Sequence, residues 1–208
     1  MKLKICGMKY PENIQEVAAI LPDYMGFIFY KKSPRFFNGE IPTIPNSIQK
    51  VGVFVNATLE EIITKTLQYE LDLVQLHGNE TPQFCTDLKT ELDHQKKETV
   101  KIIKAFPVND FFDFNNCKPY ETTCDFFLFD TKGENPGGNG TSFDWQVLKD
   151  YSLTKPFFLS GGIGLDKTES LKQLKLPIYA IDVNSKFETK PGNKNIQLLK
   201  KLQHELSR

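Results

Sequence analysis

Short apolar runs alternate with helical patterns along the whole chain, and this alternation constrains the fold more than any other feature. Eight runs, most of them rich in β-branched or aromatic residues, have the length and composition of strands buried on both faces. They cover Leu3–Cys6, Tyr24–Tyr30, Val51–Val55, Leu73–Leu76, Val100–Ala105, Phe126–Asp130, Pro156–Leu159 and Ile178–Val183. Such strands are typical of parallel sheets, whose two faces are both covered.

Helical patterns fill most of the intervals between these runs. Thr58 and Thr81 each precede such a pattern, and a threonine oxygen at that position accepts hydrogen bonds from the first turn. We expect helices over Asn13–Leu21, Thr58–Tyr69, from Thr81-Pro82 onward, and over Asp144–Tyr151, Asp166–Leu174 and Asn193–Leu206. The intervals 38–47 and 111–120 contain prolines, so helices there are expected to be short, broken or poor.

Strand and helix thus alternate eight times, which predicts a parallel sheet with crossover helices. A length of 208 residues is the lower end for a (β/α)8 barrel, or TIM barrel. An open doubly wound sheet is the alternative, but eight strands without a visible break between domains favour closure. Residues 1–208 are therefore expected to form a single barrel domain with its active site at the C-terminal face of the strands.

The composition excludes several classes of partner. The chain has 26 basic and 26 acidic residues, so its charge balance favours neither nucleic acid nor an anionic membrane. No apolar run is long enough to span a membrane, and the N-terminus lacks the apolar segment of a signal peptide. We expect a cytoplasmic protein whose four cysteines are free thiols. Whether it is a monomer or a homodimer stays open.

The first expected strand has two different faces. Side chains alternate along a strand, so Lys2, Lys4 and Cys6 share one face while Leu3 and Ile5 share the other. The apolar pair suits packing under helices. The other face then points into the barrel, with Cys6 at its mouth and Lys4 beneath it.

Polar residues follow the expected strands where each one ends. In a barrel, the loops after the strands build the site, so residues far apart in sequence meet at one mouth. These residues are Cys6, Arg35, Asn56, His77, Asp130, Gly161-Gly162 and the run Asp182 to Ser185. His77 has no second histidine at metal-ligand spacing, so we expect no metal there.

The segments after the seventh and eighth strands have the character of a phosphate site. Ser160-Gly161-Gly162-Ile163-Gly164 offers backbone N–H groups that can surround an anion, and Asn184 and Ser185 supply the second half. A Gly-Gly pair alone is more often a tight turn than a ligand site. Its position beside the polar run after the eighth strand favours phosphate.

Two further residues have a plain structural alternative. Asp130 could simply brace a loop, and Arg35 could be a solvated surface charge, although arginine also suits bidentate capture of a carboxylate. Four glycines in residues 133–140 indicate a mobile loop beside a ligand.

Taken together, these stretches resemble one family in order along nearly the whole chain. They are Lys4-Ile5-Cys6-Gly7, Gly26-Phe27-Ile28-Phe29, Ser33-Pro34-Arg35-Phe36, Val51-Gly52-Val53-Phe54-Val55-Asn56, Val74-Gln75-Leu76-His77-Gly78, Phe129-Asp130-Thr131, Phe143-Asp144-Trp145, Leu159-Ser160-Gly161-Gly162, Asp182-Val183-Asn184-Ser185 and Pro191-Gly192. The family is phosphoribosylanthranilate isomerase, of tryptophan biosynthesis. Each stretch alone is weak, but their order is specific.

The resemblance implies an Amadori rearrangement of N-(5-phosphoribosyl)anthranilate without cofactor or metal. Asp130 would be the general acid that protonates the furanose ring oxygen, and Cys6 the general base that removes the proton from the sugar C2. The resemblance also implies that Arg35, His77 and Asp182 contact the small-molecule substrate. Gly161, Gly162, Asn184 and Ser185 would bind its phosphate.

The resemblance raises a question about how Cys6 is ionised, and the chain differs from the family pattern in one loop. An ordinary thiol has a pKa of about 8.5, so Cys6 needs help to become a thiolate, and Lys4 either favours that thiolate or pairs with a carboxylate such as Asp182. The family's loop usually has a basic residue where Thr141 follows Gly140, and Lys132 is either its substitute or a solvated residue.

Two other functions share part of this set of residues. Another phosphosugar isomerase on the same barrel, such as the histidine-pathway enzyme, typically has an aspartate where this chain has Cys6. A non-catalytic phosphate-binding barrel would have no reason to keep both Cys6 and Asp130.

Overall fold

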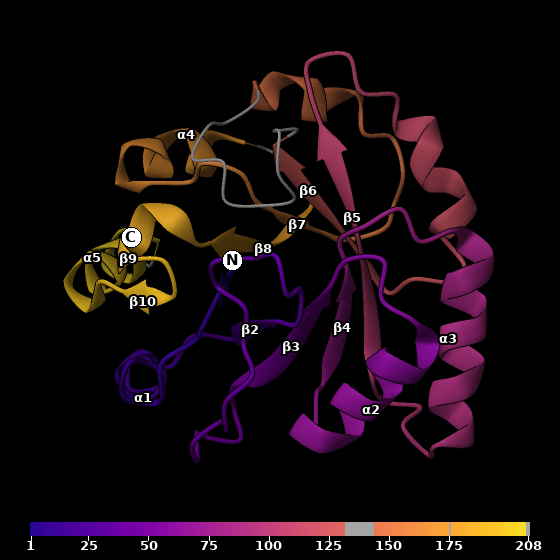
Figure 1. The fold of residues 1–208 in the computed structure, drawn as a ribbon. Coiled ribbons are helices and arrows are strands. Elements are labelled where there is room, and N and C mark those ends of the chain that lie inside the picture. Colours follow the sequence, from indigo (N-terminus) through magenta and orange to yellow (C-terminus); the bar gives the residue numbers. More distant parts are fainter. Residues whose placement is uncertain (132–143, 175, 207–208) are drawn as a thin grey trace.

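Eight parallel strands form a closed barrel in which each strand pairs with the next and β8 pairs with β1 (Figure 1). The computed structural model describes residues 1–131, 144–174 and 176–206. The strands are β1 Lys2–Ile5, β2 Tyr24–Ile28, β3 Gln49–Phe54, β4 Leu73–Leu76, β5 Lys101–Val108, β6 Phe126–Thr131, β7 Phe157–Leu159 and β8 Ile178–Val183. The expected (β/α)8 barrel is confirmed, and two of the strands have the expected bounds.

Five α-helices occur in the described residues. They are α1 Pro11–Ala18, α2 Leu59–Tyr69, α3 Pro82–His94, α4 Thr168–Gln173 and α5 Ile196–Leu206. Both expected threonine caps are present, because Thr58 Oγ1 accepts from Glu61 N at 3.1 Å and Thr81 Oγ1 accepts from Phe84 N at 3.2 Å. Helices α2 and α3 lie side by side on one flank of the barrel (Figure 1).

Several expected helices are shorter than predicted or absent. Residues 38–47 form no helix, since Pro42 and Pro45 remove backbone donors and clash with a preceding turn. Short 3₁₀ helices at Phe114–Tyr120, Trp145–Asp150 and Leu165–Lys167 replace α-helix in three further intervals, the last of them leading into α4. The barrel therefore closes without a regular helix behind every strand.

The predicted helix Asn193–Leu206 is wrong at its start. Residues Glu188–Lys190 (β9) and Asn193–Lys194 (β10) form an antiparallel hairpin that turns at Pro191-Gly192. Helix α5 begins only at Ile196, after Asn195 Oδ1 accepts a hydrogen bond from Leu198 N at 3.2 Å. Asparagine caps helices in this way, so the chain enters the helix two residues after the hairpin.

Two apolar layers enclose the barrel wall. Leu3 and Ile5 belong to the outer layer between strands and helices, as expected for that face of β1. The inner layer fills the barrel and includes Val51, Ile103 and Leu128. Lys4 is fully buried on the inner face, so the predicted two-faced first strand is confirmed.

Three aspartates connect neighbouring strands at the end of the barrel opposite the mouth. Asp23, Asp72 and Asp125 each stand directly before a strand and accept a hydrogen bond from the backbone of the preceding strand. The distances are 2.9 Å from Leu3 N, 2.8 Å from Lys50 N and 2.8 Å from Ile102 N. Hydrogen bonds to charged acceptors are the stronger ones, so these aspartates fix strand register at that end. Among the described helices, none is both long and apolar enough to cross a membrane.

Candidate active site

Cys6, Asp130 and Asp182 lie at the mouth of the barrel, where β1, β6 and β8 end. Their exposed fractions are 5%, 5% and 6%, so the ends of these strands place thiol and carboxyl groups out of bulk water. The neighbouring strand leaves room for the thiol, because a Cβ on Gly26 would lie 2.7 Å from Cys6 Sγ. Glycine is therefore the residue that fits beside Cys6.

Lys4 and Asp182 form a buried ion pair beneath Cys6. Lys4 Nζ donates to Asp182 Oδ2 at 2.8 Å, and Lys4 is 0% exposed. Burial lowers the pKa of Lys4, but the Asp182 carboxylate and the Cys6 thiolate outweigh burial and raise that pKa above its ordinary value. Lys4 is thus a permanent cation inside the barrel. Asp182 Oδ1 is buried and has no hydrogen-bond partner among the described residues.

The Cys6 thiol is the stable form before substrate binds. Burial raises the pKa of Cys6 above its ordinary value, while Lys4 opposes this rise, Asp182 adds to it and Lys194 also opposes it. A buried thiolate is costly unless a cation faces it. Lys4 lowers the pKa of Cys6, as expected, but burial raises that pKa by more.

Replacing Lys4 by methionine should make Cys6 harder to ionise. Lys4→Met removes the nearest opposing cation and leaves Asp182 as an unpaired neighbour, and both changes raise the pKa of the thiol. We expect the rate of Cys6 alkylation, followed by mass spectrometry of its peptide, to reach its half-maximum at higher pH than in the wild type. Lys2→Met, two residues earlier on the same strand, is the matched control. A superimposable pH profile in folded Lys4→Met would remove Lys4 from the control of Cys6.

Asp130 is held from two sides. Its Oδ1 accepts from the N–H of Thr131 at 3.0 Å, and His77 Nε2 lies 3.3 Å from its Oδ2. His77 in turn contacts Gln75, whose Nε2 lies 2.8 Å from His77 Nδ1. The carboxyl group is therefore oriented by two side chains, Gln75 of β4 and His77 directly after it, of which the sequence analysis had singled out only His77.

Arg35 has a carboxylate partner within the chain. Arg35 Nε lies 3.0 Å from both oxygens of Glu188, and its Nη2 donates to Glu188 Oε2 at 2.8 Å. Lys194 Nζ donates to Glu188 Oε1 at 2.7 Å, so one buried carboxylate serves two cations. Arg35 Nη1 has no hydrogen-bond partner among the described residues.

Glu188 and Lys194 were missed by the sequence analysis because a helix was predicted over the second of them. The turn signal Pro191-Gly192 between two polar segments could have indicated the hairpin. In the hairpin register, Lys194 stands opposite Glu188. Asn13 fixes this arrangement from α1, since its Oδ1 accepts from Lys194 N at 2.6 Å and its Nδ2 donates to Lys194 O at 3.0 Å.

Loss of the Glu188 charge should destabilise the protein strongly. Glu188→Gln leaves the buried Lys194 and the partly buried Arg35 without their carboxylate, and breaking a buried ion pair from one side costs about 3–5 kcal/mol. Although burial raises the pKa of Glu188, Arg35 and Lys194 outweigh it and hold that pKa below 4.5. The stabilisation is thus present above this pH and is lost as the pH falls further below it.

Urea unfolding at neutral pH and near pH 3 measures this effect. The difference between wild type and Glu188→Gln should be large at neutral pH and should shrink in acid. Glu60→Gln, at an exposed position of α2, is the control and should change stability by a few tenths of a kcal/mol. Equal stability of Glu188→Gln and wild type at neutral pH would contradict the prediction.

The predicted phosphate segments lie next to the same mouth. Gly161 has a φ of +91°, and a Cβ there would collide with Thr131 at the end of β6. Within the described residues, no backbone carbonyl accepts from the N–H groups of Gly161, Gly162 or Ser185. Backbone carbonyls of the described residues thus leave these three N–H groups unoccupied.

The loop after β1 contacts the loops after β2 and β8. Gly7 has a φ of +75°, and a Cβ there would lie 2.7 Å from both Arg35 Cδ and Asn184 Oδ1. Asn184 Oδ1 also accepts from Lys194 Nζ at 2.7 Å. Arg35, Asn184 and Lys194 are thus gathered around the glycine that follows Cys6.

Some expected features fall outside the described residues. They are the glycine-rich stretch 133–140, Lys132 and Thr141. In the part of the chain that the structure describes, no group of three or more His, Cys, Asp or Glu side chains is placed to hold a metal ion.

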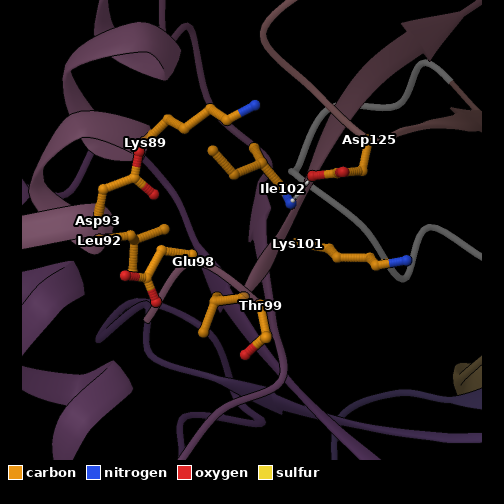
Figure 2. Close-up of a pocket in the computed structure, with 9 residues that line it drawn as sticks. Lys89, Leu92, Asp93, Glu98, Thr99, Lys101, Ile102 and Asp125 are labelled. Carbon is orange, nitrogen blue, oxygen red and sulfur yellow. Dashed lines mark hydrogen bonds between the residues drawn. The ribbon is translucent and has the colours of Figure 1, made fainter. Parts of the chain in front are cut away.

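A hollow lies at the other end of the strands (Figure 2). It has a volume of about 220 Å³ and is lined by charges of both signs, among them Lys89, Asp93 and Lys101 around the start of β5. None of the predicted site residues lines it.

Comparison with known proteins identifies relatives along the whole chain. Residues 3–205 match the family described as N-(5'-phosphoribosyl)anthranilate (PRA) isomerase. The chain is 45% identical over 208 residues to the N-(5'-phosphoribosyl)anthranilate isomerase of Parabacteroides distasonis, covering 96% of this chain and 90% of that protein. It is 39% identical over 196 residues to the protein of the same name from Phocaeicola vulgatus, covering 94% and 92%.

Solved structures show the same architecture. The phosphoribosyl anthranilate isomerase of Thermus thermophilus superposes with a TM-score of 0.85 at 25% identity, covering 100% of this chain and 98% of that one. A second such isomerase, solved in complex with reduced 1-(o-carboxyphenylamino)-1-deoxyribulose 5-phosphate, gives 0.82 at 27% identity with the same coverage. A third, from Thermotoga maritima, is described as monomers generated from a dimeric isomerase and gives 0.78 at 26% identity, again with the same coverage.

Proposed function

Because the chain belongs to the N-(5'-phosphoribosyl)anthranilate isomerase family, an isomerase family of tryptophan biosynthesis, we propose that Asp130 and Cys6 carry its reaction as general acid and general base. The reaction is the Amadori rearrangement of N-(5'-phosphoribosyl)anthranilate to 1-(2-carboxyphenylamino)-1-deoxyribulose 5-phosphate. It needs one proton given to the furanose ring oxygen and one proton taken from the sugar C2. No bound cofactor or metal is required by this proposal.

The first step opens the sugar ring. Asp130, in its protonated form, gives its proton to the ring oxygen while the anthranilate nitrogen forms a C=N bond with C1, which produces a Schiff base. The hydrogen bond from Thr131 N and the contact with His77 hold the carboxyl group of Asp130 in one orientation. They also stabilise the carboxylate that the step leaves behind.

The second step removes the C2 proton. Cys6 accepts it as a thiolate, and the electron pair of the C–H bond forms the C1–C2 double bond of an enolamine that tautomerises to the ketone. Lys4 offsets the charge of the thiolate from below. Because burial raises the pKa of the thiol, the thiolate is the minor form until the substrate is bound.

Substrate anions have matching groups at the rim. The free Nη1 edge of Arg35 suits the anthranilate carboxylate, and Glu188 holds the guanidinium in place for it. The unpartnered Asp182 Oδ1 suits a sugar hydroxyl, and His77 lies beside the ring-opening acid. The N–H groups around Gly161, Gly162, Asn184 and Ser185 suit the phosphate, although the short 3₁₀ turns there add little dipole.

The observation that carries the proposal is the convergence of Cys6 and Asp130 on one buried polar layer. They stand at the ends of β1 and β6. Asp182, at the end of β8, interacts electrostatically with both Asp130, which raises its pKa, and Lys4, which lowers it. A barrel that only bound phosphate would need neither a buried thiol nor a buried acid at its mouth.

Anthranilate fluorescence tests the proposal directly. Purified protein should convert freshly made N-(5'-phosphoribosyl)anthranilate, with the fluorescence change of that conversion. The histidine-pathway aminoimidazole substrate, supplied in parallel, should not turn over. Absence of turnover of the anthranilate adduct by correctly folded protein would refute the function, and turnover of the other substrate alone would favour the rival isomerase. A single domain over residues 1–208, a cytoplasmic location and a monomeric or homodimeric state remain predictions.

A further inference from the structure

We propose that Gln75 is a positioning residue that fixes the tautomer of His77, so that His77 donates its Nε2–H to Asp130. The inference rests on the proposed role of Asp130 as the acid. It assigns to Gln75 a task in the reaction although Gln75 lies beneath the mouth and contacts His77 instead of the substrate.

Strand β4 places the two side chains on one face. Gln75 is the third residue of β4 and His77 follows two positions later, so both point into the barrel. Gln75 is 1% exposed, and its Nε2 lies 2.8 Å from His77 Nδ1. An amide nitrogen only donates, hence Nδ1 accepts and carries no proton.

A neutral imidazole has one donor and one acceptor. With Nδ1 accepting, the proton is on Nε2, which lies 3.3 Å from Asp130 Oδ2. Gln75 thus donates to Nδ1 of His77, and the protonated Nε2 of His77 faces Asp130 Oδ2 as an electrostatic contact.

The opposite amide orientation is the poorer one. It would place Gln75 Oε1 against Nδ1 and leave the amide NH₂, with its two donors, buried where Oε1 now has no partner among the described residues. The present orientation leaves one carbonyl oxygen and one amide hydrogen without a partner among the described residues, whereas the opposite one leaves two amide hydrogens, and a buried carbonyl is left unpaired more readily than a buried N–H. The orientation with Nε2 toward His77 is therefore preferred.

The tautomer decides whether His77 competes for the catalytic proton. An unprotonated Nε2 facing a protonated Asp130 would accept its hydrogen bond and hold the proton away from the sugar. A protonated Nε2 cannot do this, and it stabilises the carboxylate after Asp130 has given its proton to the ring oxygen. Gln75 thereby directs the proton of Asp130 toward the substrate.

Nitrogen NMR reads this tautomer without substrate. The chain has three histidines, so a protein labelled with ¹⁵N in its histidine rings gives three ring patterns in a long-range ¹H–¹⁵N correlation. The pattern of His77 is assigned by its loss in His77→Asn. We expect Nε2 protonated and Nδ1 unprotonated and hydrogen-bonded. A protonated Nδ1 in the wild type would overturn the inference, whether or not the protein turns over.

Gln75→Met links the tautomer to turnover. Methionine matches glutamine in length and has no donor, so the Nδ1 resonance should move toward the value of an unprotonated nitrogen without a hydrogen bond. We expect kcat to fall about tenfold with KM nearly unchanged, since the acid is mispositioned while substrate contacts remain. Gln203→Met, which removes a glutamine hydrogen bond to Ile20 O far along the chain, is the control and should retain wild-type kcat. An unmoved Nδ1 resonance and a wild-type kcat in Gln75→Met would overturn the proposal, while leaving the proposed function intact.

Discussion

Asp130→Asn should lower kcat by roughly 10²–10⁴-fold, the contribution typical of a positioned general acid. An amide is nearly the same size as the carboxyl group and can keep the hydrogen bond from Thr131, but it has no proton to give to the ring oxygen. The substrate should still bind, because the groups matched to its carboxylate and phosphate lie on other strands. Steady-state kinetics with the anthranilate adduct, together with circular dichroism of the variant, measures the effect.

The matched control for this variant is Asp110→Asn. Asp110 is an exposed aspartate whose Oδ1 accepts from Asp144 N at 3.1 Å, and its amide variant should retain wild-type kcat. If folded Asp130→Asn kept a kcat within a few-fold of the wild type, the ring-opening proton would have to come from another group.

Cys6→Ala should cause a loss of similar size by blocking the other proton transfer. Alanine cannot accept the C2 proton, whereas Asp130 remains able to open the ring, so the reaction should stop before the enolamine forms. We expect kcat to fall by roughly 10²–10⁴-fold. Substrate carrying deuterium at C2 should keep its label in the presence of Cys6→Ala and lose it with the wild type.

Cys117→Ala separates this effect from the loss of a buried sulfur. Cys117 is also fully buried, and burial raises its pKa to about 12, so it is an inert thiol in the core. Its alanine variant should lose some stability but keep its turnover. Loss of the C2 label with Cys6→Ala at the wild-type rate would show that another group is the base.

The strands could be predicted from the sequence because most are short runs rich in apolar, β-branched or aromatic residues. The helical layer was less predictable, since prolines at 42, 45 and 119 show only that a regular helix is disfavoured and not what replaces it. The hairpin of β9 and β10 was missed for a different reason. Its strands are three and two residues long, too short to show alternation, and its partner surface is provided by α1.

The site residues likewise fall into those that the sequence predicts and those that it does not. Cys6, Asp130, Asp182 and the glycines after β7 could be singled out because each stands at the end of a strand, and parallel strands in a barrel all end at one mouth. Gln75 and Glu188 could not be singled out from the sequence. Gln75 reads as one more polar residue in a strand, and the role of Glu188 depends on two cations that are far away in sequence or across a turn.

The sequence by itself determined the alternation of strands and helices, the two faces of β1 and the set of residues that end at the mouth. These properties depend on the side-chain period of a strand and on the direction of parallel strands, which are local or topological. Only the tertiary structure decided which charges meet. It paired Lys4 with Asp182, gave Arg35 to Glu188, and turned His77 toward Asp130, because hydrogen bonds and ion pairs depend on distances of about 3 Å between strands that the sequence separates widely.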